Sequence, residues 1–117
     1  MSDPADCLFC KIRDGVIPAE IIHDDDRCLA FHDIHPQAPL HALVVPRRHI
    51  ATLNDAGDDD AALLGHLVLV AGKLARAAGV ADSGFRTLFN CNRGAGQTVF
   101  HIHLHLLGGR SLGWPPG

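Results

Sequence analysis

The spacing of hydrophobic residues predicts two helices, one short and one long. Near the N-terminus apolar residues recur at helical spacing, so we expect a short helix over 6–14 with Asp6 as its cap. The same period continues over 58–78. Acidic residues stand at the start of this second segment and a glycine follows its end, as is typical of a long helix.

Short apolar or alternating segments between turn residues predict strands in the rest of the chain. We expect five of them, over 20–23, 28–34, 41–45, 85–90 and 98–107. Strands in hairpin-like order around one long helix favour an α+β fold with a five-stranded antiparallel sheet. The 117 residues contain no internal repeat and no linker-like segment, so a single domain over 1–117 is expected.

The apolar face of the expected long helix is broader than one core needs. Its stripe consists of Leu63, Leu64, Leu67, Val68, Ala71, Leu74, Ala75 and Ala78. Leu69 and Val70 widen this stripe. The pattern is compatible with ordinary burial and equally with a second contact surface such as a dimer interface.

Composition and charge limit the partners and the location. The net charge is −3 with histidine neutral, so no overall basic field exists for a nucleic acid polymer, whereas a small anion needs only a local site. Residues 1–10 lack the features of a signal peptide, and we find no segment apolar enough to span a membrane. We therefore expect a cytoplasmic protein in which the four cysteines stay reduced.

Three alternating histidines are the most informative chemical feature. Period-two alternation puts His101, His103 and His105 on one side of the expected last strand, with neighbours about 7 Å apart. Such a row can be a solvated face, a shared metal site or a catalytic group. The preceding loop contains Gly94 and Gly96, whose backbone N–H groups can cradle phosphate oxygens. Together these features favour phosphoryl or nucleotidyl transfer on a small ligand.

Residues 97–107, Gln-Thr-Val-Phe-His-Ile-His-Leu-His-Leu-Leu, resemble the signature of the histidine triad family, in which three histidines alternate with apolar residues. The resemblance extends over nearly the whole chain. Segments 31–39 and 41–46 are similar to the family's ribose-contacting segment and the strand after it, and residues 108–110 and 114–117 resemble its Hint branch.

This resemblance implies a homodimer whose two sheets join into one continuous sheet, with a purine nucleotide pocket in each subunit. It implies hydrolysis of adenosine or guanosine phosphoramidates to AMP or GMP and an amine. One alternative is a dinucleoside polyphosphate hydrolase or nucleotidyltransferase of the same superfamily, which the short length and the ending disfavour. Another is a nucleotide-binding interaction protein, which the intact triad disfavours.

The resemblance also implies a role for each polar residue of the site. His103 would attack the α-phosphorus and form a nucleotidyl-histidine, His105 would contact phosphate oxygens, and His101 would support the fold of the site. His41 would hold the tautomer of His103. Thr98 would hydrogen-bond the leaving nitrogen through its hydroxyl.

The nucleotide pocket that the resemblance implies combines one carboxylate with apolar walls. Asp33 would accept hydrogen bonds from the ribose hydroxyls. The base would be enclosed by Phe9, Ile12, Phe31, His32 and Ile34. The ribose and phosphate end would be lined by Asn90, Gly96, Gln97 and Val99, together with Thr98, His103 and His105.

A pair of cysteines near the N-terminus departs from many Hint relatives. Other members of the wider family carry such a pair and bind zinc, which here implies a structural zinc held by Cys7, Cys10, His49 and His101. The alternative is that both cysteines are small buried residues of a helix face. Catalysis by His103 needs no cofactor in either case. Of the remaining histidines, His23, His35 and His66 are interpreted as surface or core residues, and Cys28 as core.

Overall fold

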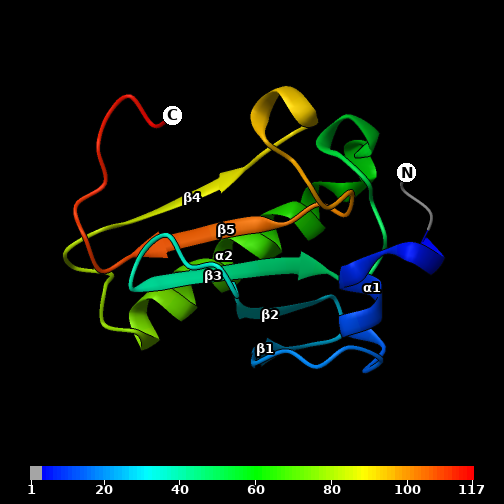
Figure 1. The fold of residues 1–117 in the computed structure, drawn as a ribbon, viewed down its shortest axis with the longest axis horizontal. Helices are drawn as coiled ribbons and strands as arrows, with labels where there is room; N and C mark the ends of the chain where they lie inside the picture. The colour runs from blue at the N-terminus through cyan, green and yellow to red at the C-terminus, as the bar shows by residue number, and fades with distance from the viewer. Residues whose placement is uncertain (1–3) are drawn as a thin grey trace.

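The computed structural model describes residues 4–117, which form a five-stranded antiparallel sheet with one long helix (Figure 1). The sheet order is β1-β2-β3-β5-β4. The strands are β1 (Ile21–Asp24), β2 (Cys28–His32), β3 (Leu40–Pro46), β4 (Phe85–Phe89) and β5 (Leu104–Gly108), and the α-helices are α1 (Leu8–Arg13) and α2 (Ala61–Ala77). The predicted α+β architecture is confirmed in these respects.

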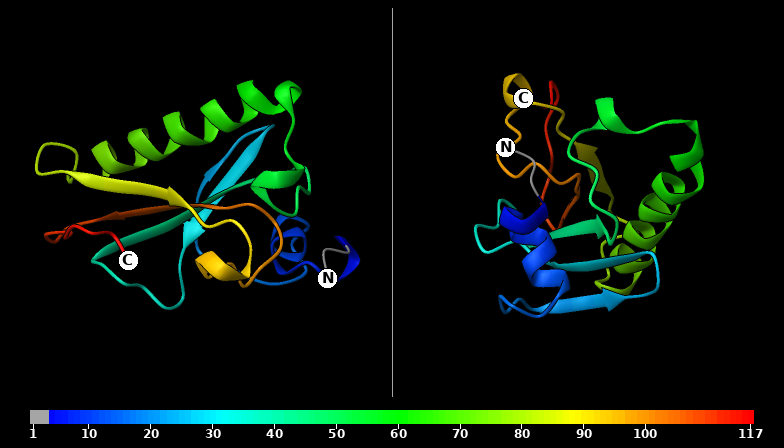
Figure 2. Two further views of the ribbon diagram at one scale, coloured as in Figure 1. Left: turned by 90° about the horizontal axis from the view of Figure 1, so that it is seen from above. Right: turned by 90° about the vertical axis from the view of Figure 1, so that its right-hand side faces the viewer.

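The two helices pack on opposite faces of the sheet (Figure 2). Alternation along β2 sends Cys28 and Ala30 into the core under α2, and Leu29 and Phe31 into the core beside α1. The core under α2 also contains Leu40, Ala42, Val44, Leu67, Val70, Ala71, Ala75, Leu104 and Leu106. The core beside α1 contains Cys7, Phe9, Cys10, Leu43 and Val45. The second core places α1 next to the histidines.

The last strand is shorter than predicted, because β5 begins at Leu104 rather than at residue 98. Its pairing with β3 starts at Leu104 and Val44. At the end of β3, Pro46 has no backbone N–H to donate to a neighbouring strand. Its carbonyl accepts a hydrogen bond from the ring of His101 rather than from a strand N–H. Only His105 of the three histidines therefore lies in a strand, and His101 and His103 lie in the irregular segment before it.

Both helices also begin later than predicted. At α1 the N-cap is Cys7, whose Sγ accepts the N–H of Cys10, rather than Asp6. Before α2, residues 58–60 form a separate 3₁₀ turn, in which the Asp60 carboxylate accepts the N–H of Gly57 and pairs with Arg48. These side-chain contacts are not visible in a hydrophobic pattern.

The buried face of α2 differs from the predicted stripe. Val70 is buried in the core, whereas Val68 and Leu69 are 46% and 66% exposed. Burial against the sheet therefore accounts for only part of the apolar surface of α2. No helix within residues 4–117 has both the length and the apolar composition to cross a membrane.

Candidate active site

A cavity of about 470 Å³ lies between α1, the ends of β2 and β4, and the histidine segment. It is lined by Leu8, Phe9, Ile12, Ile17, Pro18, Ala19, Glu20, Phe31, His32, Asp33, Ile34, His35, Leu43, Asn90, Gly96, Thr98, Val99, His103 and His105. The structure thus brings together all the predicted nucleotide-binding residues except Gln97. Phe9 and Phe31 meet edge to face within this wall, with ring centroids 5.5 Å apart.

Gln97 lies behind the cavity wall and holds the preceding loop. Its side chain is buried, accepts the N–H of Asn92 at 2.7 Å, and donates to the carbonyls of Ala51 and Val99. The neighbouring Gly96 has a left-handed backbone conformation with φ +89°. Any other residue would be strained in this conformation. Gln97 therefore shapes the loop from behind and does not line this cavity, so its contact with a nucleotide stays a prediction.

His103 presents a free nitrogen to the cavity. Its Nδ1 lies 2.8 Å from the carbonyl oxygen of His101, and because a carbonyl only accepts, Nδ1 must carry the proton. The other nitrogen, Nε2, then holds a lone pair. Burial lowers the pKa of His103 and keeps the ring neutral near pH 7. A neutral imidazole with an available Nε2 is a competent nucleophile.

A second hydrogen-bonded chain sets the tautomer of His105. The N–H of Gln37 donates to Nδ1 of His41, so His41 carries its proton on Nε2 and donates to Nδ1 of His105 at 2.9 Å. The remaining nitrogen of His105, Nε2, is then protonated and can donate to a ligand. Burial is the main cause of the lowered pKa of His105, about 4, so its ring is neutral at pH 7.

The role predicted for His41 therefore needs a correction. The carbonyl of His101 holds the tautomer of His103, and His41 orients His105 instead. The sequence could not distinguish these contacts, because His41 lies across from the end of β5 in the β3–β5 ladder. Asp33 lies close to this chain, with Oδ2 3.4 Å from Nε2 of His41, and also lines the cavity.

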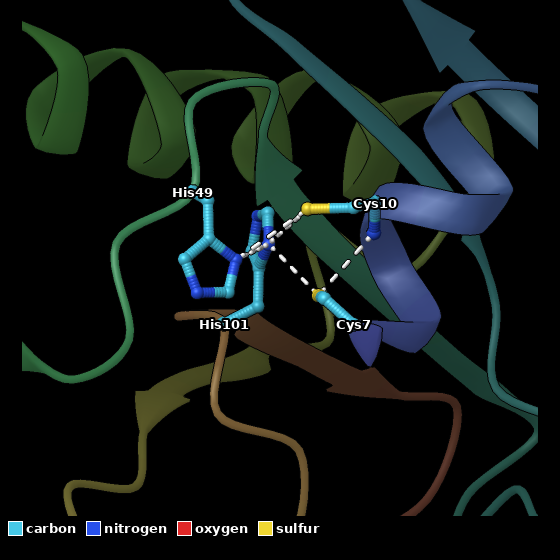
Figure 3. A group of neighbouring side chains, drawn as sticks. All are labelled: Cys7, Cys10, His49 and His101. Carbon is cyan, nitrogen blue, oxygen red and sulfur yellow. Dashed lines mark hydrogen bonds between the residues drawn. The ribbon is translucent and has the colours of Figure 1, made fainter. Parts of the chain in front are cut away.

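The four residues predicted to bind zinc lie together near the start of α1 (Figure 3). We call Cys7, Cys10, His49 and His101 the Cys/His cluster. Nδ1 of His101 lies 3.3 Å from Sγ of Cys7, 3.5 Å from Sγ of Cys10 and 3.2 Å from Nδ1 of His49. Sγ of Cys10 lies 3.4 Å from Nδ1 of His49.

These distances fit a tetrahedral zinc ion. Zinc–nitrogen bonds of about 2.0–2.1 Å and zinc–sulfur bonds of about 2.3 Å place tetrahedral ligands about 3.3–3.8 Å apart. Nε2 of His101 donates to the carbonyl of Pro46 at 2.7 Å, which leaves Nδ1 as a lone pair directed into the cluster. The chemistry and the geometry agree, so the Cys/His cluster could hold a zinc ion.

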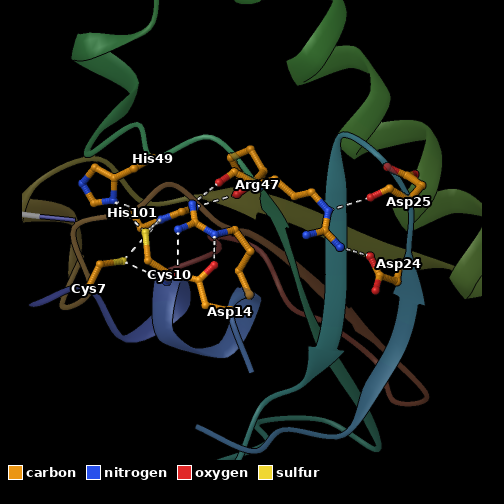
Figure 4. Close-up of polar contacts among 10 residues, drawn as sticks. Cys7, Cys10, Asp14, Asp24, Asp25, Arg47, His49 and His101 are labelled. Atoms are coloured by element: carbon orange, nitrogen blue, oxygen red, sulfur yellow. Dashed lines mark hydrogen bonds and ion pairs between the residues drawn. The ribbon is translucent and has the colours of Figure 1, made fainter. Parts of the chain in front are cut away.

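The Cys/His cluster is joined to the sheet by charged side chains (Figure 4). Arg13, which follows Cys10 by one turn of α1, pairs with Asp14 and donates to the carbonyl of Arg47 at 2.6 Å. Arg47 in turn pairs with Asp24 at the end of β1. Arg47, two residues before His49, is therefore held by α1 on one side and by β1 on the other.

Several cavity residues were not predicted from the sequence. Leu8, Leu43 and the segment 17–19 add apolar wall, and Glu20 and His35 add polar groups near the rim. Ile17-Pro18 marks an extended segment, which is a signal for a loop but not for a pocket. His35, for which the sequence predicts a surface or core position, is exposed and also lines the cavity.

Comparison with known proteins supports a common family for the whole chain. Residues 14–112 match the HIT domain family. A HIT-like protein of Synechococcus elongatus is 52% identical over 112 residues, which cover 96% of this chain and 97% of that protein. The structure of a HIT family hydrolase from Legionella pneumophila is 56% identical, with a TM-score of 0.94, and covers 96% of this chain and 100% of its own.

A more distant structure carries a more specific name. The histidine triad nucleotide-binding protein of Candida albicans is 33% identical, with a TM-score of 0.79, over 94% of this chain and 83% of its own. Sequence and fold agree in all of these comparisons, and the alternating histidines lie inside the matched region. This chain therefore belongs to the histidine triad, or HIT, family.

Proposed function

We propose that this protein is a nucleotide-binding hydrolase that cleaves the P–N bond of purine nucleoside phosphoramidates. The observation that carries the proposal is the state of His103. Its Nδ1–H is bonded to a backbone carbonyl, its ring is kept neutral by burial, and the ring lines a cavity large enough for a nucleotide. A structural relative named as a hydrolase and another named as nucleotide-binding support the same class of activity.

In the first step, Nε2 of His103 forms a bond to the α-phosphorus while the P–N bond breaks. The leaving nitrogen takes the electron pair of that bond and departs as an amine after it takes a proton from solvent. The hydroxyl of Thr98, which lines the cavity, is the group proposed to hydrogen-bond this nitrogen. The Nε2–H of His105 would donate to a phosphate oxygen and stabilise the developing charge.

In the second step, water attacks the phosphorus of the nucleotidyl-histidine and releases a proton to solvent. The P–N bond to His103 breaks, the ring recovers its lone pair, and AMP or GMP is released. His101 supports both steps through its carbonyl, which keeps Nδ1 of His103 protonated. No step needs a metal ion.

The remaining cavity residues suit the nucleoside. Phe9 and Phe31 are buried aromatic rings that can face a flat purine. Asp33 accepts the N–H of His35 at 2.8 Å through Oδ1, and Oδ2 is available to a ribose hydroxyl. Asn90 and Gly96 also line the cavity and are proposed to contact the ribose and the phosphate.

Zinc in the Cys/His cluster would stabilise the site. Cys7 and Cys10 would attach α1 to His49 and His101, and so fix the carbonyl that holds His103. The ion would supply cross-linking between distant segments rather than Lewis acidity.

We also propose a homodimer, as the family resemblance implies. Within residues 4–117, β4 pairs only with β5, so its other edge is available to a second copy. The exposed Val68 and Leu69 of α2 and the exposed Phe85 of β4 provide apolar surface. Analytical ultracentrifugation of the protein and of Leu69→Asp tests this; an unchanged monomer in both would contradict the dimer.

The decisive experiment measures hydrolysis of an adenosine phosphoramidate and looks for the adduct. The wild-type protein should release AMP and form a nucleotidyl adduct detectable by mass spectrometry after rapid quenching. His103→Asn should lose turnover by at least about 10³-fold, as expected when a nucleophile is removed, and should form no adduct. His105→Asn keeps the nucleophile and serves as the matched control, with slower turnover and a detectable adduct.

Two results would change the assignment. AMP binding without turnover on any phosphoramidate would favour a nucleotide-binding interaction protein. Faster turnover of diadenosine polyphosphates than of phosphoramidates would favour the dinucleoside polyphosphate hydrolase or nucleotidyltransferase.

A further inference from the structure

A second group of metal-ligand side chains lies where the turn between β1 and β2 meets α2. We call His23, Asp25, Cys28 and His66 the Asp25 cluster. Their ligand atoms all lie within 4.8 Å of one another. None of the four lines the cavity, and none belongs to the Cys/His cluster. The catalytic proposal makes no use of them.

The carboxylate of Asp25 organises this cluster. Oδ1 accepts the backbone N–H groups of Arg27 and Cys28, each at 2.8 Å, which fixes the orientation of the carboxylate. Oδ2 therefore points toward the other side chains. Nε2 of His23 and Nε2 of His66 each lie 2.7 Å from Oδ2, and Sγ of Cys28 lies 3.6 Å from it.

Three side chains thus direct protons at one oxygen atom. A carboxylate oxygen offers about two lone pairs, so Oδ2 cannot serve two imidazoles and a thiol equally well. A divalent cation placed between the four groups would bond to all of them at once. The set of two imidazoles, one thiolate and one carboxylate is suited to zinc and to other borderline transition metals.

Burial of the four side chains is compatible with exchange of an ion. Cys28 is fully buried and forms the floor of the cluster. The side chains of His23, Asp25 and His66 are 28%, 25% and 17% exposed, so an ion from solvent can reach them. They come from β1, the turn after it, and α2, so one ion would tie the edge of the sheet to the helix.

We propose that the Asp25 cluster is a second metal site, which binds zinc or a similar divalent transition-metal ion. On binding, the proton of each imidazole moves from Nε2 to Nδ1, and the thiol of Cys28 releases its proton to solvent. The metal then holds two neutral imidazoles, a thiolate and a carboxylate. This proposal is independent of the proposed hydrolase activity.

Two arginines face the Asp25 cluster. The guanidinium of Arg27 lies 3.1 Å from Nδ1 of His66, which must accept a proton when the metal binds. Arg27 is exposed and can turn toward solvent, so it competes with the metal without blocking it. Arg47 donates to the backbone carbonyl of Asp25 at 2.7 Å and pairs with Asp24, which leaves the Asp25 carboxylate available (Figure 4).

The test is a titration of zinc-loaded protein with Co²⁺, followed by visible absorption and by metal analysis. Loading with zinc and then desalting leaves the stronger Cys/His cluster filled. The wild type should then bind one further equivalent of Co²⁺ and show a thiolate-to-cobalt band. Asp25→Asn and His66→Gln should weaken this binding by more than the 10–100-fold typical of an outer-shell change. Asp26→Asn removes the same charge from the same turn and should bind like the wild type.

Thermal unfolding with and without zinc gives a second readout. Added zinc should raise the Tm of the zinc-loaded wild type and of Asp26→Asn, and should leave that of His66→Gln unchanged. Equal Co²⁺ binding by the wild type, Asp25→Asn and His66→Gln, or no binding by any, would overturn the proposal. If His66→Gln does not fold, His23→Gln removes a more exposed ligand and is judged by the same outcomes.

Discussion

The Cys/His cluster and the Asp25 cluster flank the segment 46–49 and satisfy their polar atoms in opposite ways. In the Cys/His cluster, the Nδ1 lone pair of His101 faces another imidazole nitrogen and two sulfurs. In the Asp25 cluster, protons of two imidazoles and a thiol face a carboxylate oxygen. The first cluster therefore presents lone pairs that would suit a cation, whereas in the second the protons already face a negative charge.

This difference determines what each group contributes to the protein. Lone pairs that converge in a buried place repel one another, so a bound cation would stabilise the Cys/His cluster. Protons that converge on a carboxylate form a stable network, so a metal must displace them to bind the Asp25 cluster. The first arrangement predicts a permanent structural ion, and the second predicts a weaker and exchangeable one.

The largest expected effect comes from breaking the Cys/His cluster. Cys7→Ser should remove the structural zinc and lower the free energy of unfolding by about 4 kcal/mol or more, the range of a lost metal site. Calorimetry and metal analysis of the purified protein measure both quantities. Cys91→Ser is the matched control, since Cys91 belongs to neither cluster, and should change stability by about 0.5 kcal/mol or less. Equal stability of the two variants would contradict the structural role of zinc.

Breaking the Asp25 cluster should have a smaller effect, even without metal. Asp25→Ala removes the acceptor for the backbone N–H groups of Arg27 and Cys28 and for both imidazoles. The expected loss is about 2–3 kcal/mol, because hydrogen bonds to a charged group are among the stronger ones and the side chain is partly exposed. Asp26→Ala, from the same turn, should be nearly neutral in denaturant titrations. If Asp26→Ala is equally destabilising, the hydrogen bonds to the Asp25 carboxylate contribute little to stability.

Acid should remove the stabilising contribution of the Asp25 cluster at a lower pH than that of His41 and His105. Burial lowers the pKa of His41 and lowers that of His105 to about 4, so the unfolded chain takes up protons first, and stability is lost as the pH falls from about 6.5 toward 4. Burial alone would raise the pKa of Asp25, but hydrogen bonds from His23, from backbone N–H groups and from His66 hold it well below its usual range. Its stabilising contribution is present above about pH 4 and is lost only below that.

Unfolding titrations at a series of pH values between neutral and acid show whether the contribution of the buried histidines is lost before that of Asp25. The stability difference between the wild type and Asp25→Asn should stay constant down to about pH 5 and shrink only in stronger acid. The turnover catalysed by His103 should likewise persist below pH 6.5, because burial lowers the pKa of that ring. An acid limb of kcat/KM at or above the ordinary histidine pKa of about 6.5 would contradict the neutral, buried nucleophile.

The smallest expected effect is a change in the metal affinity of the Asp25 cluster alone. Arg27→Gln removes a positive charge and a competing donor beside His66, while an amide oxygen can accept the new Nδ1–H. Co²⁺ should bind the Asp25 cluster about 3- to 10-fold more tightly, as expected for removing a partly screened like charge. Affinity at the Cys/His cluster should not change. Weaker binding in Arg27→Gln would indicate that Arg27 supports the metal site rather than competing with it.

The sequence by itself determined the class of fold and the identity of the central chemistry. Hydrophobic period is a local property, so the pattern predicted a long helix and five strands, and the errors lie at the ends of these elements, for example where Cys7, Asp60 or Pro46 intervene. The alternating histidines and the segments around them also carried the resemblance to the HIT family. Most of the cavity wall could be named from that resemblance.

Only the tertiary structure decided which nitrogen of each histidine is free. His41 contacts His105 rather than His103, and Gln97 lies behind the wall, because these contacts depend on the register of β3 against β5 and on a loop without a period. His66 meets Asp25 across 41 positions of sequence, at a place set by how α2 packs on the sheet. Local pattern encodes the elements, whereas convergence of side chains from distant segments depends on how those elements pack.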